Sequence, residues 1–311
     1  MKAVMYHYVR RFDPNYPFFR FLDFEHFKKQ LDYFSASFGI ATRDEWEAFI
    51  EQPSHGGGSP PRGKIVLTFD DAMHCHSDYV VGELERRGLW GIFYIPTMPY
   101  SGGGILDVHR IHLLTGAVDG KVLYYELMQI IREEMIPDSK RDDFRQLTYA
   151  RQTNYAGVAE FKRLLNYFID YEYQSAVISD VAARVGYRFP DHGFYIREES
   201  LRNMAAAGHV IGSHTMHHPV MSKLSLAQQQ REIKTSFAVL EDITPLSEYT
   251  YCHPYGGFHS FNEDTVRILD EHGVRYSFNV ESADITDAHV QRHPHALPRY
   301  DCNEFPFGQT S

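Results

Sequence analysis

The sequence contains few cysteines, and none are paired at metal-binding spacing. Cys75, Cys252 and Cys302 are the only three in 311 residues, which is too few and too scattered for a disulfide framework. No two of them form a CxxC pair, so a structural zinc site made of thiolates is not expected. The 18 histidines instead make imidazole the expected ligand if the protein binds a metal ion.

Long apolar runs and excess positive charge are also missing. No segment approaches the roughly 20 apolar residues of a transmembrane helix, and the apolar run within residues 1–7 is too short for a signal peptide. We therefore expect a cytoplasmic protein with no transmembrane segment. The 31 basic residues are outnumbered by 41 acidic ones, which gives a formal net charge of −10. This balance argues against nucleic acid or an anionic membrane as a partner, because both require a basic surface.

Predicted strands and helices alternate along most of the chain. Apolar patterning predicts strands at residues 3–8, 64–69, 90–95, 209–213, 249–252, 276–280 and near 297–301, and helices at 24–38, 79–87, 198–207, 226–241 and 265–271. This alternation is typical of parallel strands joined by helical crossovers. We expect an α/β fold, specifically a distorted, partly open (β/α) barrel of about seven strands with functional residues at the strand ends.

Residues 105–190 interrupt this alternation. They are rich in tyrosine and arginine and largely helical in pattern, so we interpret them as a helical insertion within a single domain of residues 1–311. Within them, His109 and His112 have a spacing that suits the polar face of a helix, or contacts to a sugar or a second metal ion. Residues 54–62 are rich in Gly, Ser and Pro and are predicted to form a surface loop.

Two adjacent carboxylates, Asp70 and Asp71, follow the predicted strand at residues 64–69. Side-by-side acids at a buried strand end repel each other unless a cation or hydrogen bonds offset the repulsion. Taken alone, the pair is more simply explained as a helix N-cap with a second acid near the helix dipole. A further motif is needed to favour a metal site.

Histidines supply that motif after the predicted strand at residues 209–213. His214 and His218 are four residues apart, and on a helical turn this spacing places both imidazoles on one side, where they can chelate an ion. His217 competes with His218 as the partner of His214, and a polar turn with incidental histidines is the alternative. Two histidines and one carboxylate suit Zn²⁺, Fe²⁺, Co²⁺ or Ni²⁺ and leave positions open for water.

Three motifs in this order resemble those of a known family. They are Thr-Phe-Asp-Asp at residues 68–71, His-Thr-x-x-His beginning at residue 214, and Pro-Tyr-Gly at residues 254–256. Together they resemble the NodB-homology polysaccharide deacetylases, also called carbohydrate esterase family 4. The resemblance covers most of the chain outside residues 105–190, and three motifs at strand ends are more specific than any single one.

The resemblance implies a role for each matching residue. Asp71, His214 and His218 would bind one divalent ion, for which Zn²⁺ is expected and Co²⁺, Ni²⁺ and Fe²⁺ are alternatives. Asp70 would be the general base. The backbone N–H of Tyr255 would donate to the oxyanion, although Pro-Tyr-Gly alone is also an ordinary turn. This chemistry is coherent in itself, because a metal ion acidifies water and polarises an amide carbonyl.

The sequence departs from the family pattern at the group that orients the base. Many members have an arginine two residues before the proline of Pro-Tyr-Gly, where this chain has Cys252. Arg299, near the last predicted strand, is our candidate partner for Asp70. A surface salt bridge is the alternative role for Arg299.

The usual C-terminal Leu-x-x-His motif, which supplies the general acid, is also absent near residue 297. The N-terminal Val-Met-Tyr-His resembles that motif in a circularly permuted branch of the family, which would make His7 the acid. A first-strand histidine is otherwise often structural. Three other histidines are fallback candidates for the acid: His253, His293 and His295.

The resemblance implies a metal-dependent amidohydrolase acting on an amino sugar. We expect removal of an N-acetyl group, or alternatively an N-formyl group, from a sugar of a surface polysaccharide pathway such as O-antigen or capsule. The sugar would be nucleotide- or lipid-linked. Two other hypotheses are a deacylase of a small non-sugar amide and a catalytically silent glycan-binding protein. The presence of Asp70 argues against the silent protein, since a protein that only binds metal does not need a second acid beside Asp71.

Overall fold

A computed structural model describes residues 1–51, 63–135 and 157–310. The loop predicted at residues 54–62 lies outside the described residues, as does part of the predicted insertion. The chain divides into two compact units. Unit 1 comprises Met1–Arg11, Phe21–Gly104 and His192–Ser311, and unit 2 comprises Phe12–Arg20 and Ile105–Asp191.

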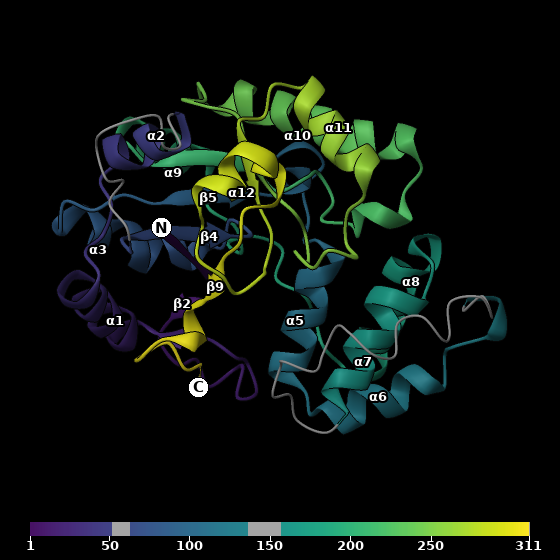
Figure 1. Cartoon of the computed structure of the whole chain (residues 1–311). Helices are drawn as coiled ribbons and strands as arrows, with labels where there is room; N and C mark the ends of the chain where they lie inside the picture. The colour runs from purple at the N-terminus through teal and green to yellow at the C-terminus, as the bar shows by residue number, and fades with distance from the viewer. Residues whose placement is uncertain (52–62, 136–156, 311) are drawn as a thin grey trace. The chain divides into compact units, whose positions relative to one another are not determined.

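Unit 1 is built on a seven-stranded parallel sheet with the order β8-β7-β6-β5-β4-β1-β9 (Figure 1). The strands are β1 (Lys2–Tyr6), β4 (Ile65–Asp70), β5 (Ile92–Ile95), β6 (Val210–Ser213), β7 (Thr250–Cys252), β8 (Tyr276–Phe278) and β9 (Tyr300–Asp301). A separate pair joins β2 (Val9–Arg10) and β3 (Leu22–Asp23). The sheet curls into half of a barrel, which confirms the expected fold class.

Helices follow the strands of unit 1 as crossovers, and Figure 1 shows α10 and α11 packed side by side. The helices are α1 (Phe24–Ser37), α2 (Arg43–Glu51), α3 (Val81–Arg86), α4 (Met98–Ser101), α9 (Glu198–Ala206), α10 (Leu226–Ile243), α11 (Glu263–Glu271) and α12 (Asp287–Arg292). A π-helical turn, η1 (His76–Val80), leads into α3, and short 3₁₀ turns are η5 (Met221–Lys223), η6 (Pro294–Ala296) and η7 (Cys302–Glu304).

The two faces of the sheet bury different apolar clusters. Along β4, Leu67 and Phe69 pack with the helices of the outer face, including Phe27 of α1. Val66 faces the other way and packs in the cluster that contains Trp46. Because side chains alternate along a strand, Asp70 points to the same side as Val66, into the concave side of the half-barrel.

Unit 2 is helical and has its own core. It contains α5 (Asp107–Ala117), α6 (Gly120–Met128), η2 (Glu133–Met135), α7 (Val158–Arg163), η4 (Leu164–Phe168) and α8 (Tyr171–Arg184). Leu114, Leu123, Phe161 and Val177 are among the residues of this core. A helical pattern was expected here, and the described part is helical. The assignment of the whole chain to a single domain stays a prediction.

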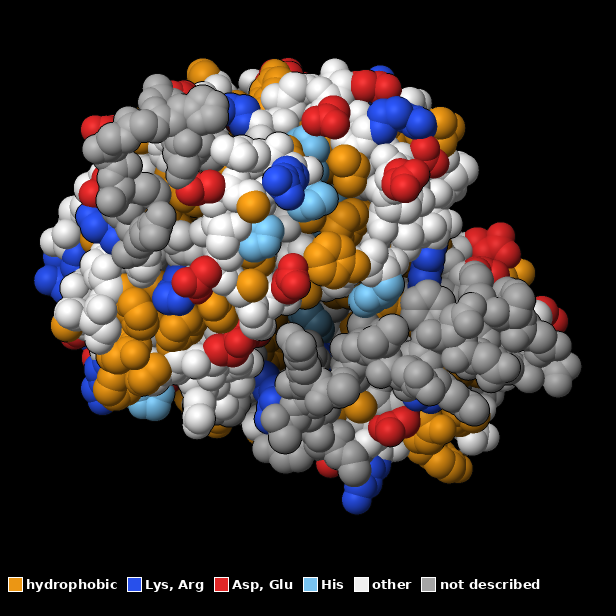
Figure 2. Space-filling model, in the orientation of Figure 1, with side chains coloured by type: hydrophobic (Ala, Val, Ile, Leu, Met, Phe, Trp, Pro, Cys, Tyr) orange, Lys and Arg blue, Asp and Glu red, His pale blue; other side chains and the backbone are white. Residues whose placement is uncertain are grey.

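Two surface properties bear on the expected partners. Among the described residues, no helix combines the length and apolarity that crossing a membrane requires. On the face shown in Figure 2, the acidic and basic side chains are interspersed, and no broad basic patch stands out.

Candidate active site

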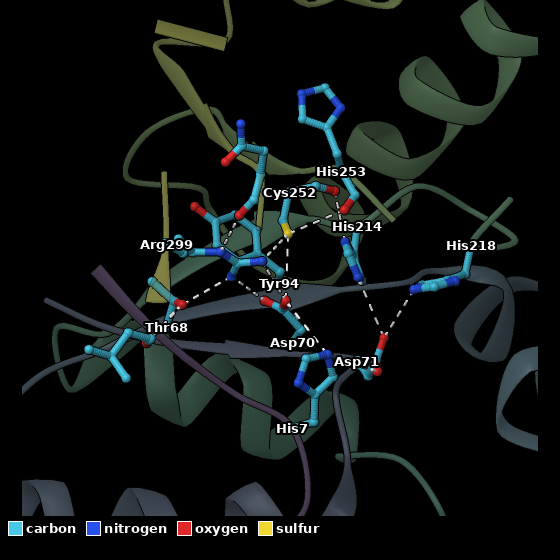
Figure 3. A network of polar contacts seen from close by, with 12 residues as sticks. His7, Thr68, Asp70, Asp71, Tyr94, His214, His218, Cys252, His253 and Arg299 are labelled. Atoms are coloured by element: carbon cyan, nitrogen blue, oxygen red, sulfur yellow. Dashed lines mark hydrogen bonds and ion pairs between the residues drawn. The ribbon is translucent and has the colours of Figure 1, made fainter. Parts of the chain in front are cut away.

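The polar residues singled out in the sequence come together at one end of the sheet. Asp70 is the last residue of β4, His214 directly follows β6, and Cys252 is the last residue of β7. The carboxyl ends of parallel strands meet at the same edge. Figure 3 shows the result: Asp70 lies between Arg299 and His7, and Asp71 faces His214 and His218.

Asp71, His214 and His218 form a compact donor set. Each offers one ligand atom, and these atoms all lie within 4.8 Å of one another. The Nε2 atoms of both His214 and His218 are 3.5 Å from Asp71 Oδ1. All three side chains are buried. Two imidazoles and one carboxylate are the donors that catalytic zinc sites use, so the set fits a divalent ion.

The ring of His214 is oriented by the strand next to it. Its Nδ1 is 2.8 Å from the backbone carbonyl oxygen of Cys252, so Nδ1 carries the proton and donates. The Nε2 lone pair is thereby directed to Asp71. Burial lowers the pKa of His214, which favours the neutral imidazole that binds metals. Histidine ligands in metalloproteins are commonly fixed by such a second hydrogen bond.

The structure distinguishes between the two possible partners of His214. His218 faces Asp71, whereas His217 is turned outward and its Nδ1 pairs with Glu232 Oε1 at 2.6 Å. The expectation of a helical turn was wrong. Residues 214–219 are an irregular loop in which Thr215 and His218 have φ values of 66° and 56°. These left-handed residues, and not helical periodicity, bring the two imidazoles together.

Arg299 and Asp70 form a fully buried pair. Two guanidinium nitrogens bind the two carboxylate oxygens, NH1 to Oδ1 at 2.9 Å and NH2 to Oδ2 at 2.8 Å. The remaining N–H groups of Arg299 donate to the Thr68 hydroxyl at 3.0 Å, the Asn279 carbonyl at 3.1 Å and the Cys252 sulfur at 2.9 Å. A guanidinium has five N–H groups, and these contacts give each of them an acceptor.

This pairing fixes the charge of Asp70. Burial opposes ionisation of the carboxyl, but the charge and hydrogen bonds of Arg299 outweigh it and lower the pKa of Asp70 to about 2. Asp70 is therefore a carboxylate at neutral pH, as a general base must be. A bidentate pair also leaves it little rotational freedom.

A second donor set, Asp70, His214 and Cys252, also brings its ligand atoms within 4.8 Å. Arg299 already holds both oxygens of Asp70 and contacts the Cys252 sulfur. Burial also raises the pKa of the Cys252 thiol. A cation at this position would meet the guanidinium charge, so the set with Asp71 is the better metal site.

His7 comes from the loop after β1 and lies beside both aspartates. Its Nε2 is 3.9 Å from Asp70 Oδ2 and 4.0 Å from Asp71 Oδ2. Its side chain is 41% exposed, unlike those of the ligand set, so solvent and substrate can reach it. The backbone carbonyl of His7 contacts Nε2 of the buried His76, which holds the end of β1 in place.

Tyr255 and Gly256 form a tight turn next to the histidines. Tyr255 has a φ of 62°, and its ring centroid is 5.0 Å from that of His218. Gly256 has a φ of 64°, and a Cβ there would lie 2.3 Å from Val280. Both the φ and the lack of space require glycine. The turn places the ring of Tyr255 against that of His218.

Left-handed backbone is concentrated around this site. Among the described residues, six that are not glycine have positive φ, and five of them lie in its loops: Asp71, Ala72, Thr215, His218 and Tyr255. Such conformations are uncommon for residues with a Cβ. They persist where surrounding contacts enforce them, and they cluster at functional sites.

The fallback acids are directed elsewhere. Nε2 of His253 is 2.8 Å from the His295 carbonyl, and Figure 3 shows its ring pointing away from the aspartates. His295 pairs with Asp270 at 2.8 Å, and His293 is exposed at the end of α12. In unit 2, the rings of His109 and His112 lie 6.0 Å apart on α5, and neither belongs to a metal-binding group found among the described residues.

Sequence reasoning missed three residues that support the site. Thr68 and Asn279 bind Arg299, and Glu232 binds the loop of His217. The alternation of β4 places Thr68 on the same face as Asp70, so that residue was within reach of a pattern argument. Asn279 acts through its backbone carbonyl and Glu232 is distant in sequence, so no local signal identifies either.

Solved structures with the same fold include two that are described as deacetylases. The *Streptococcus pyogenes* deacetylase PplD in complex with acetate matches at 12% identity with a TM-score of 0.59, covering 97% of this chain and 91% of that one. IcaB from *Ammonifex degensii* matches at 15% identity and TM-score 0.53, covering 96% and 90%. The BpsB deacetylase domain from *Bordetella bronchiseptica* matches at 13% and 0.52, covering 96% and 94%. At these identities the likeness establishes the fold.

The family itself is indicated by the sequence. Residues 172–277 match the polysaccharide deacetylase family model. This segment contains His214, His218 and the Pro-Tyr-Gly turn, while Asp70 and Asp71 precede it. Over this segment the chain is similar to the polysaccharide deacetylase family, and the fold is shared with the solved structures above.

Proposed function

We propose that this protein hydrolyses the N-acyl group of an amino sugar, with N-acetyl as the expected group and N-formyl as the alternative. One divalent ion, expected to be Zn²⁺, would be held by Asp71, His214 and His218. The expected substrate is a nucleotide- or lipid-linked sugar of a surface polysaccharide pathway. The match of residues 172–277 to the polysaccharide deacetylase family model supports the sugar substrate, and the buried donor set supports the ion.

The residues divide the work of amide hydrolysis. A bound divalent ion supplies Lewis acidity, which polarises the acyl carbonyl and acidifies water. Asp70 accepts the proton of the attacking water. The backbone N–H of Tyr255 donates to the oxyanion of the tetrahedral intermediate. His7, which is partly exposed beside both aspartates, protonates the leaving amine.

One observation carries this proposal: Asp70, which is not one of the three proposed ligands, is held ionised beside them. Arg299 makes a bidentate contact with Asp70. This contact requires a buried arginine whose N–H groups all have acceptors. A protein that only bound metal or glycan would not need an ionised carboxylate beside the proposed ligands. It therefore favours turnover over a catalytically silent role.

The test is release of acetate or formate from N-acyl amino sugars, free and carrier-linked, before and after chelation of metal. We expect release by the wild type that chelator abolishes and added Zn²⁺ or Co²⁺ restores. Asp70→Asn should lower kcat by about 10²- to 10⁴-fold, the usual contribution of a general base, while sugar binding is retained. Normal sugar binding with no acyl release from any substrate would overturn the proposal in favour of a binding protein. Release from small non-sugar amides alone would reassign the substrate.

The role of His7 is tested separately in the same assay. His7→Ala should retain bound metal but lose a large part of kcat, because the leaving amine is then expelled without a proton. His293→Ala is the matched control, since that histidine is exposed at the end of α12. Unchanged turnover in His7→Ala would exclude His7 as the acid.

A further inference from the structure

The loop that carries His214 and His218 rests against one carboxylate of helix α10. Glu232 Oε2 accepts the backbone N–H of Met216 at 3.1 Å and that of His217 at 2.8 Å. Its other oxygen, Oε1, pairs with Nδ1 of His217 at 2.6 Å. The Glu232 side chain is only 12% exposed. One side chain thus binds two consecutive amides between the two histidine ligands.

The next turn of α10 continues the same contact. The Ser236 hydroxyl donates to the carbonyl oxygen of Thr215 at 3.0 Å and is 2.8 Å from the hydroxyl of Ser213. Within the loop, the Thr215 hydroxyl accepts the backbone N–H of His218 at 2.9 Å. Side chains of α10 therefore bind the loop at the amides of Met216 and His217 and at the carbonyl of Thr215.

This support matters because the loop has an unfavourable backbone. Thr215 and His218 both have positive φ, a region that residues with a Cβ rarely adopt and that persists only when neighbours enforce it. If the loop relaxed, His214 and His218 would no longer face Asp71 together. A metal ion would then have to reorder the loop as it bound.

We infer that Glu232 is a positioning residue that preorganises the His214–His218 loop for metal binding. It binds no substrate and is not a ligand. Its carboxylate accepts the hydrogen bonds of the two loop amides, so that the imidazoles are already aligned before an ion binds. This inference rests on the metal site of the proposed function.

The contact geometry supplies a conservative variant. Both amides bind the single oxygen Oε2, so a glutamine with its carbonyl oxygen in that position keeps both hydrogen bonds and loses only the charge. Alanine loses both. His217→Ala removes the ion pair with Glu232 but leaves the two amide contacts. Asp242→Asn, on an exposed residue of the same helix, is the matched control for lost negative charge.

The experiment has two readouts on the full chain. The first is the dissociation constant for Co²⁺, measured by its absorption spectrum and by competition with a chelating dye. The second is hydrogen–deuterium exchange of the Met216 and His217 amides without metal. Glu232→Ala should weaken Co²⁺ binding by about 10- to 100-fold, the range for residues that orient metal ligands, and speed exchange at both amides. Glu232→Gln, His217→Ala and Asp242→Asn should stay near the wild type.

The two readouts separate the inference from the proposed function. If Glu232→Ala, folded by circular dichroism, bound Co²⁺ as tightly as the wild type and kept both amides protected, the inference would be overturned. A Glu232→Gln variant as weak as Glu232→Ala would also overturn it, because charge and not the amide contact would then matter. Wild-type protein that bound no metal would overturn the proposed function, while amide exchange would still decide whether Glu232 holds the loop.

Discussion

At the scale of single residues, the pair Asp70–Arg299 does two jobs at once. It keeps Asp70 ionised, and it allows this carboxylate to be buried inside the half-barrel. Burial of an ion pair is tolerated only when each partner is well bonded. Here Thr68, Cys252 and Asn279 take up the remaining donors of the arginine. The resemblance to the family places an arginine at position 252, and this fold brings one from residue 299 instead.

Replacing Arg299 tests this coupling. Arg299→Met should lower the free energy of unfolding by about 3–5 kcal/mol, because it leaves a buried charge without its partner. The double variant Arg299→Met/Asp70→Asn should recover part of that loss, since neither charge remains. Urea unfolding of the two single variants and the double variant measures the coupling. Strictly additive losses would show that the two residues stabilise the fold independently.

At the scale of elements, a buried histidine joins the beginnings of two neighbouring strands. His209 directly precedes β6, and its Nδ1 accepts the backbone N–H of Gly91, which directly precedes β5, at 3.1 Å. Its ring packs edge-on against Phe93, with centroids 5.3 Å apart. Burial lowers the pKa of His209 to about 4. The hydrogen bond needs the neutral ring, because a protonated Nδ1 cannot accept.

This contact predicts loss of stability in mild acid. The pKa of His209 in the folded state lies below the unfolded value of about 6.5, so between pH 6.5 and 4 the unfolded chain binds more protons. The contribution of His209 is complete above pH 6.5 and declines as the pH falls, by at most about 1.4 kcal/mol per pH unit. His209→Asn keeps an acceptor but cannot titrate, so its urea-unfolding free energy should depend less steeply on pH. An identical slope in both proteins would refute the assignment.

Much of this architecture was predictable from sequence, because strands and helices carry clear periodicity. The helix predicted at residues 24–38 is α1, and the strand predicted at residues 64–69 is β4. The local shape of the histidine loop was not predictable. Its left-handed residues are held by contacts with α10, and sequence spacing alone did not exclude His217 as the partner of His214. Residues that make a contact through a backbone atom, such as Asn279, cannot be identified from the side-chain types of a single sequence.

At the scale of the whole molecule, the donor set links metal binding to the stability of unit 1. An ion that binds the folded chain and not the unfolded one adds RT ln(1 + [L]/Kd) to the unfolding free energy. The proposed ligands come from the loops after β4 and β6, which are separated in sequence by the two crossovers that lead into and out of β5. Metal binding should therefore raise the free energy of global unfolding of unit 1.

Thermal unfolding with and without metal tests this link. At a free Zn²⁺ concentration of 100 times Kd, the unfolding free energy should rise by about 2.7 kcal/mol, and chelator should reverse the rise. Asp71→Asn and His214→Ala should lose most of the metal-dependent increment. Asp70→Asn should keep it, because that residue is not in the proposed ligand set. A similar increment in all four proteins would place the ion elsewhere.

The order of the strands also has a consequence for synthesis on the ribosome. β1 lies between β4 and β9, so the first and last strands of the sheet are neighbours. Asp70 is synthesised 229 residues before Arg299, with which it pairs. Until that arginine leaves the exit tunnel, a nascent chain holds an unneutralised carboxylate that burial disfavours. The concave side of the half-barrel should therefore stay open to solvent until β9 has been synthesised. Its final closure should coincide with release of the last strand.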